Sequence, residues 1–120
     1  MTNSNADNFV SVKNFKTIFW PSELVTCSLR LNVAAFRALM LLMTAGIVTE
    51  KFCSEIKVSS KEVAEFVGCT NLRKTILELK DATLIYPSVN GKEIHWFNKI
   101  EIKNGIITYQ FNDALSGCMS

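Results

Sequence analysis

Residues 59–81, SSKEVAEFVGCTNLRKTILELKD, carry the signals for two short helices separated by a glycine. Ser59 and Glu62 have the spacing of a capping box, in which each side chain accepts a hydrogen bond from the other residue's backbone N–H. Gly68 suits the left-handed conformation that ends a helix, and Thr70 is placed to cap the second helix. Two helices joined by a short turn with a glycine predict a helix-turn-helix.

Both helices have an apolar face, and a hairpin signal follows them. The second helix carries Leu72, Ile76 and Leu79 at i, i+4 and i+7, the repeat of one helical face. Asn90-Gly91 is a strong hairpin signal, because both central residues of a type I′ turn need positive φ. A hairpin directly after a helix-turn-helix would act as its wing. The expected fold class is therefore α+β, a winged helix.

The N-terminal third is expected to contain a polar end, an arm and a short helix. Residues 1–8 are rich in asparagine and are expected to be disordered, so the folded domain is expected to span residues 9–120. Residues 9–20 partly alternate, which predicts an extended arm. Pro21 suits the first position of a short helix that follows the arm.

The principal helix is expected to begin after Asn32 as its N-cap. Gly46 either ends this helix or loosens its last turn. Leu41 and Leu42 widen the apolar face, which favours a helix buried on more than one side. The face itself repeats with helical spacing and comprises Phe36, Leu39, Met40, Met43 and Ile47.

Strands are expected around the two short helices. Pro87 cannot donate a ladder hydrogen bond, so its strand should lie at a sheet edge or break there. Asn104-Gly105 predicts a second hairpin, and Trp96 is expected to be a core or interface anchor. The expected strands cover residues 55–58, 83–89, 93–97, 99–103 and 106–111.

Composition excludes several classes of function. The chain has 120 residues and a net charge of +2, so DNA binding would need a local basic patch. Four cysteines without a C-x-x-C pair indicate free thiols in a reducing cytoplasm, although pairing stays open. The N-terminus lacks the features of a signal peptide, and the apolar run 33–48 is too short to span a membrane.

Motifs of catalysis and of cofactor or metal binding are missing from the sequence. It shows no Gly-rich phosphate loop, nucleophile elbow or zinc-finger spacing. His95 is expected to be an ordinary strand residue. We therefore expect no enzyme activity, no cofactor, no metal and no membrane contact, and a small enzyme with a polar pocket around His95 is the least favoured class.

The candidate DNA contacts cluster around the second short helix. Arg73 could read a guanine edge, and Asn71 an adenine or a phosphate. Lys74 suits a phosphate, as does Lys61 at the start of the preceding helix. Thr70 and, at the tip of the expected wing, Lys92 complete the set.

The alternative is a winged helix that binds only protein. Residues 57–80 contain five basic and three acidic residues, a weak bias, and a charged helix face is usually just solvated. Helix-turn-helix geometry also occurs in domains that only dimerise. Salt-dependent binding to duplex DNA separates the two possibilities.

Several segments together resemble the plasmid Rep initiator family. Ser22-Glu23-Leu24-Val25, Leu29–Leu31 and the apolar helix after Asn32 are similar to the opening of that family. The later matches are Val58–Ala64, His95–Ile100 and Asn104–Asn112, so the resemblance covers roughly residues 20 to 115 in the same order.

The resemblance implies two tandem winged-helix domains that bind repeated origin sequences in plasmid DNA and start replication. The first domain would mediate homodimerisation and make auxiliary DNA contacts, many of them to phosphates, and the second would make the main major-groove contacts. Dimers would act as repressors or inhibitors, and monomers as initiators. The expected second domain is absent from the 120 residues. They are therefore expected to be the first domain, either as an isolated domain or as part of a longer chain, and not a complete initiator.

Overall fold

The computed structural model describes residues 9–13, 15, 31–52, 54–68, 71–85 and 93–118. The expected disorder of residues 1–8, the proline-led helix, the strand at Pro87 and the Asn90-Gly91 turn lie outside these residues. The elements are, in order, β1 (Phe9–Val10), α2 (Val33–Val48), β2 (Ile56–Ser59), α3 (Ser60–Val67), α4 (Leu72–Asp81), β3 (Thr83–Ile85), β4 (Glu93–His95), β5 (Phe97–Lys103), β6 (Ile106–Phe111) and the 3-10 helix η3 (Asp113–Cys118).

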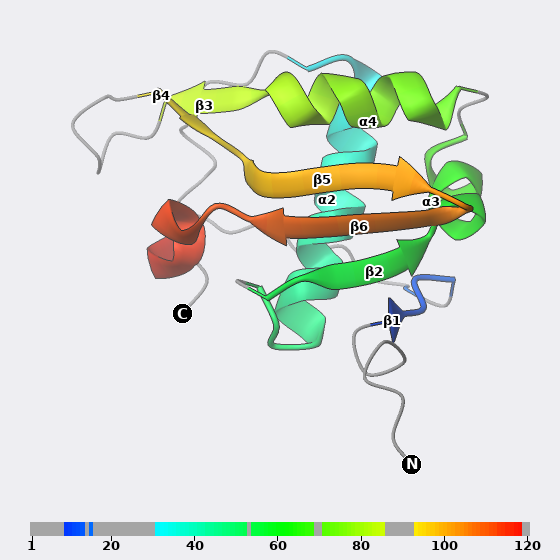
Figure 1. Cartoon of the computed structure of the whole chain (residues 1–120), viewed down its shortest axis with the longest axis horizontal. Helices are drawn as coiled ribbons and strands as arrows, with labels where there is room; N and C mark the ends of the chain where they lie inside the picture. Colours follow the sequence, from blue (N-terminus) through cyan, green and yellow to red (C-terminus); the bar gives the residue numbers. More distant parts are fainter. Residues whose placement is uncertain are drawn as a thin grey trace.

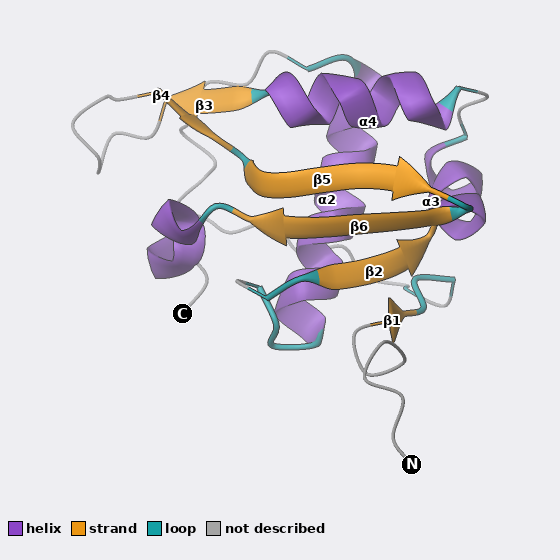
Figure 2. Cartoon of the chain, viewed as in Figure 1, coloured by secondary structure: helices purple, strands orange, loops and turns teal. Residues whose placement is uncertain are grey.

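The described strands form a four-stranded sheet in the order β1-β2-β6-β5 and a separate pair, β3-β4. β1 is parallel to β2, and the other pairs are antiparallel. α2 crosses behind the larger sheet, α4 runs beside β5 and α3 lies at the end of the sheet (Figure 1). Helices and strands are thus mixed along the chain (Figure 2), which confirms the α+β class.

α2 forms the centre of the core, as its sequence predicts. The Oδ1 atom of Asn32 accepts a hydrogen bond from Ala35 N at 2.8 Å, so the predicted N-cap is confirmed. Leu39 and Met43 of the predicted face are fully buried, and so are Leu41 and Leu42. The helix is therefore enclosed on more than one side.

Gly46 lies inside α2, which continues to Val48. A Cβ atom at Gly46 would lie 3.1 Å from Phe52 Cδ1 and 3.3 Å from Phe52 Cα. The glycine thus lets the chain after the helix fold back closely over its last turn. Phe52 uses this position to stack on Phe111 of β6, with ring centroids 4.3 Å apart.

The hairpin of β5 and β6 follows the expected turn chemistry. Asn104 and Gly105 have φ values of 54° and 76°, as a type I′ turn requires. β5 begins at Phe97, two residues before the expected start, and Asn98 lies at an irregularity between Phe97 and Lys99. This β-bulge accommodates Asn98 as an extra residue, at the point where the alternation of the sequence breaks.

The capping box forms in one direction only. Ser59 Oγ accepts a hydrogen bond from Glu62 N, at 3.3 Å. The Glu62 carboxylate does not return to Ser59, which is also the last residue of β2 and pairs with Ile106 of β6. Instead, Glu62 Oε1 accepts hydrogen bonds from Val12 N, Lys13 N and Ser11 Oγ at 2.9, 3.2 and 3.3 Å.

The expected arm is thus extended at β1 and attached to two elements. Phe9 and Val10 pair with β2, and the following residues are held by Glu62 of α3. Val12 is 2% exposed and belongs to the core. The arm therefore covers the β2 edge of the sheet and fixes the start of α3.

Candidate nucleic-acid interface

The two helices of the predicted motif are separated by a left-handed glycine. Gly68 has φ +75° and donates a hydrogen bond from its N–H to Ala64 O at 2.8 Å, which ends α3. No atom lies within 4 Å of a Cβ built at Gly68, so backbone conformation alone favours glycine there. The predicted break between α3 and α4 is confirmed.

The N-cap of α4 differs from the prediction. Asn71, and not Thr70, caps the helix: its Oδ1 accepts a hydrogen bond from Lys74 N at 3.1 Å. Asparagine is at least as good an N-cap as threonine, and this cap makes the buried Leu72 the first helical residue. Thr70 itself lies outside the described residues.

The cap limits how Asn71 could contact DNA. Bidentate reading of adenine needs both the oxygen and the nitrogen of the amide, and the oxygen already accepts the Lys74 N–H. The Nδ2 group remains as a donor, which suits a phosphate. Asn71 is exposed at the start of the helix, where the positive end of the helix dipole also favours an anion.

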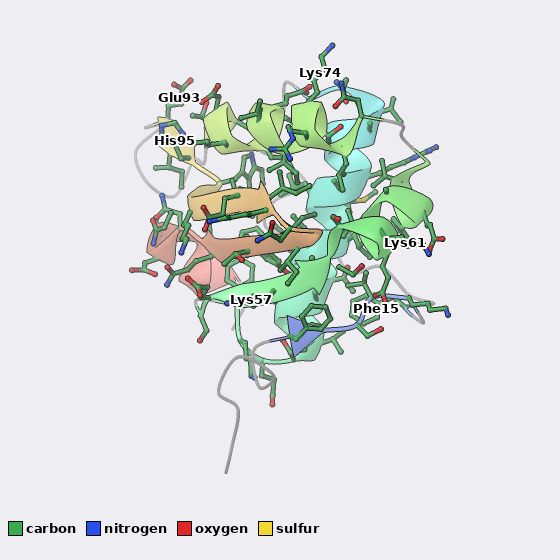
Figure 3. The ribbon with its side chains drawn as sticks, turned by 45° about the vertical axis from the view of Figure 1, so that its right-hand side comes forward. Phe15, Lys57, Lys61, Lys74, Glu93 and His95 are labelled. Carbon is green, nitrogen blue, oxygen red and sulfur yellow. The ribbon has the colours of Figure 1, made fainter. Side chains whose placement is uncertain are left out.

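α4 turns its basic residues to solvent. Arg73 and Lys74 are exposed in its first turn, whereas Leu72, Ile76 and Leu79 are buried. Figure 3 shows Lys74 pointing away from the body of the molecule, and Lys61 at the start of α3 pointing in another direction. Arg73 and Lys74 are thus neighbours in the first turn of α4, whereas Lys61 lies on α3 and points elsewhere (Figure 3).

Two nearby carboxylates, those of Glu78 and Glu62, have partners of their own. Glu78 Oε1 accepts a hydrogen bond from Asn32 Nδ2 at 2.7 Å, and Glu78 Oε2 one from Asn32 N at 3.2 Å. Glu78 thereby ties α4 to the start of α2, and Glu62 holds the arm. Of the three acidic residues in this region, Glu65 alone is exposed, and it forms no salt bridge to another described residue. The hydrogen bonds fix where the Glu62 and Glu78 carboxylates lie, but their donors are neutral and leave the charge count unchanged.

One lysine of the sheet, Lys99, is paired with carboxylates. Lys99 Nζ lies 2.9 Å from Glu55 Oε2 and 3.7 Å from Glu101 Oε1. The hydrogen bond from Lys99 lowers the pKa of Glu55, and the same bond raises the pKa of Lys99. In the described residues, Arg73, Lys74 and Lys80 of α4 form no ion pair within 4 Å, and neither do Lys57 of β2 and Lys103 of β5. α4 is therefore one of the surfaces that carry unpaired positive charge.

Two hairpins follow α4, and they occupy different places. β3 and β4 pair as expected for the hairpin directly after the helices, but they form a sheet of their own. β5 and β6 join β2, and their turn is attached to α3 by a hydrogen bond from Ser60 N to Gly105 O at 2.9 Å. Lys92, placed at the tip of the first hairpin by the sequence, lies outside the described residues.

Other kinds of site find little support in the described parts of the chain. His95 is exposed on β4 beside Glu93 (Figure 3). Among the described residues, no three His, Cys, Asp or Glu side chains are grouped closely enough to hold a metal ion. Within the same residues, no helix is both long and apolar enough to cross a membrane.

The structure combines the α3–α4 unit with a three-stranded antiparallel sheet of β2, β6 and β5. The β3–β4 pair connects the two along the chain. This arrangement defines a winged-helix domain. A family described as Initiator Replication protein, WH1, matches residues 17–119. The match covers most of the chain, so the protein belongs to this family of N-terminal winged-helix domains of plasmid replication initiators. None of the curated proteins matches the chain.

Proposed function

We propose that this domain binds double-stranded plasmid origin DNA without catalysis, through the first turn of α4. The observation that carries the proposal is the exposed pair Arg73 and Lys74, which have no ion pair among the described residues. Both lie beside the capped N-terminus of α4, where backbone N–H groups favour phosphate. Glu78, four residues after Lys74, is held by Asn32 and forms no ion pair with Lys74.

The contacts are mostly to phosphates. Arg73 and Lys74 approach the backbone from the helix, and Asn71 donates from Nδ2. Lys61 adds a phosphate contact from α3, and Thr70 and Lys92 retain the roles expected from the sequence. Contacts of this kind position a protein on DNA and carry little sequence information, which fits a domain that assists a main reading domain.

Homodimerisation in the cytoplasm is the second part of the proposal. The arm and the sheet edges are the surfaces that suit it, because exposed strand edges pair readily with another chain. β1 is only two residues long and Phe9 is 42% exposed, so a second copy could add apolar contact there. Sedimentation over a range of protein concentrations, with Phe9→Gln as the variant, tests this part.

Salt dependence tests the DNA contact. Binding of the wild type to a fluorescent duplex should weaken steeply with salt, and Arg73→Gln/Lys74→Gln should reduce the slope of log K against log salt by about 1 for each phosphate-binding cation that is removed. Lys13→Gln/Lys57→Gln removes the same charge at the arm and β2, away from α4, and should preserve most of the slope. If neither salt-dependent binding nor a change of slope appears, the alternative of a domain that binds only protein is favoured. Salt-dependent binding with equal slopes for both double variants would contradict α4 as the DNA contact.

A further inference from the structure

A groove of about 180 Å³ lies between α4 and β5 and is separate from the outward surface of Lys74. Its floor is apolar: Ile76 of α4 and Ile100 of β5 are 2% and 5% exposed. Ile102 of β5 is half-buried at the rim and packs against the core. A ligand seated here would therefore bury apolar surface.

The α4 rim of the groove has a regular pattern. Arg73, Leu77 and Lys80 follow one another at i, i+4 and i+7, so they lie on one face of the helix. The two cations are about 10 Å apart along the helix axis. Leu77 stands between them and is 57% exposed.

The charge of the groove is positive in spite of Glu101 on the β5 rim. Lys99 lies 3.7 Å from Glu101 and partly balances its charge. Arg73 and Lys80 have no ion pair with other described residues. The groove thus offers two unpaired cations on either side of an apolar centre.

This combination suits a peptide better than a nucleic-acid backbone. A phosphate chain would satisfy the cations, but it would leave Leu77 and Ile102 facing polar groups. A helix could satisfy Arg73, Leu77 and Lys80 of the α4 rim together. It would need two carboxylates two turns apart, for the two cations, and an aliphatic side chain half-way between them, for the leucine. Amphipathic helices bind apolar grooves through such i, i+3/i+4 and i+7 anchors.

We infer that the α4–β5 groove binds an acidic amphipathic helix of a partner protein. An aliphatic residue of the partner packs between Leu77 and Ile102, and its carboxylates pair with Arg73 and Lys80. The site goes beyond the proposed DNA contact and shares only Arg73 with it. A partner bound here would compete with DNA for that arginine.

The probe is a fluorescent, helix-forming alanine–glutamine peptide with two glutamates seven residues apart and leucines midway between them. Its anisotropy should rise on titration with the wild-type domain. Leu77→Gln and Lys80→Gln should each weaken binding about fivefold or more, as expected for an anchor and a charge at the centre of an interface. Matched controls, Phe66→Gln on α3 and Lys57→Gln on β2, should change it less than about twofold.

The inference is overturned if the peptide does not bind, or if Lys57→Gln weakens binding as much as Lys80→Gln does. It is also overturned if Leu77→Gln converts a dimer to monomers in sedimentation, which would make the groove a contact between two copies. Leu77 and Lys80 are exposed, so the variants should unfold like the wild type. Neither residue belongs to the proposed DNA contacts, so failure here leaves the DNA proposal to its own salt-dependence test.

Discussion

Replacing Glu62 by alanine is expected to release the N-terminal arm from α3. Glu62 Oε1 accepts hydrogen bonds from Val12 N, Lys13 N and Ser11 Oγ. Alanine removes all three bonds and leaves the backbone cap from Ser59 Oγ in place. The effect should therefore be confined to the attachment of the arm.

The cost follows from the burial of each bond. The bond to Val12 N is 2.9 Å long, partly buried and made to a charged acceptor, and should contribute about 1.5 kcal/mol. The bonds to Lys13 N and Ser11 Oγ are longer and exposed, and should add roughly 0.3 kcal/mol each. The free energy of unfolding should fall by about 2 kcal/mol in total.

Urea unfolding measures this decrease, and Glu65→Ala is the matched control. Glu65 lies in the same helix with the same charge, but it is exposed and its side chain does not hold the arm. The midpoint of Glu62→Ala should fall by about 1 M urea, and that of Glu65→Ala should hardly change. Hydrogen exchange at the Val12 amide should accelerate in Glu62→Ala alone.

Equal midpoints for the two variants would refute this reasoning. So would rapid exchange of the Val12 amide in the wild type, because a held amide must be protected. Glu62→Gln keeps an oxygen acceptor and removes only the charge. Its stability should fall between those of the wild type and Glu62→Ala.

Three further substitutions test separate features of the fold. Gly68→Ala should lower the unfolding free energy by about 1 kcal/mol in urea titration, from the left-handed backbone alone, and an unchanged midpoint would contradict this. Tyr109→Phe removes the hydrogen bond from Tyr109 Oη to Leu42 O (2.9 Å) and should lower the free energy of unfolding, measured by thermal unfolding, by about 1 kcal/mol. A variant as stable as the wild type would show that this bond contributes nothing. Lys99→Met should destabilise the fold at pH values above the ordinary carboxyl pKa, because the ion pair lowers the pKa of Glu55. The difference in stability from the wild type should vanish as the pH falls through that lowered pKa, and it should shrink in salt. A difference that persists in acid would argue against the pair.

Features set by local chemistry could be predicted from the sequence. Asn32 caps α2 because its side chain reaches an N–H three residues away, and Gly68 and Asn104-Gly105 take positive φ because few other residues do so readily. The mixed α+β class follows from these signals and the apolar periodicity.

Features set by distant partners could not be predicted. Glu62 finds the arm about fifty residues away in sequence, whereas its spacing from Ser59 suggested a reciprocal capping box. Glu78 finds Asn32, a distant partner that no local pattern indicates. The choice of Asn71 over Thr70 as N-cap depends on which start lets Leu72 reach the core. Lys80 was not predicted from the sequence to line a binding groove, although its helical spacing from Arg73 and Leu77 is present there.

An NMR titration of the isotope-labelled domain with duplex DNA tests the central claim most directly. We predict that amide shifts concentrate at Asn71–Lys74 and at Lys61 and diminish with added salt. Shifts confined to the outer face of the sheet around Lys57 and Lys99, or no shifts at low salt, would contradict the assignment of α4 as the surface that meets DNA.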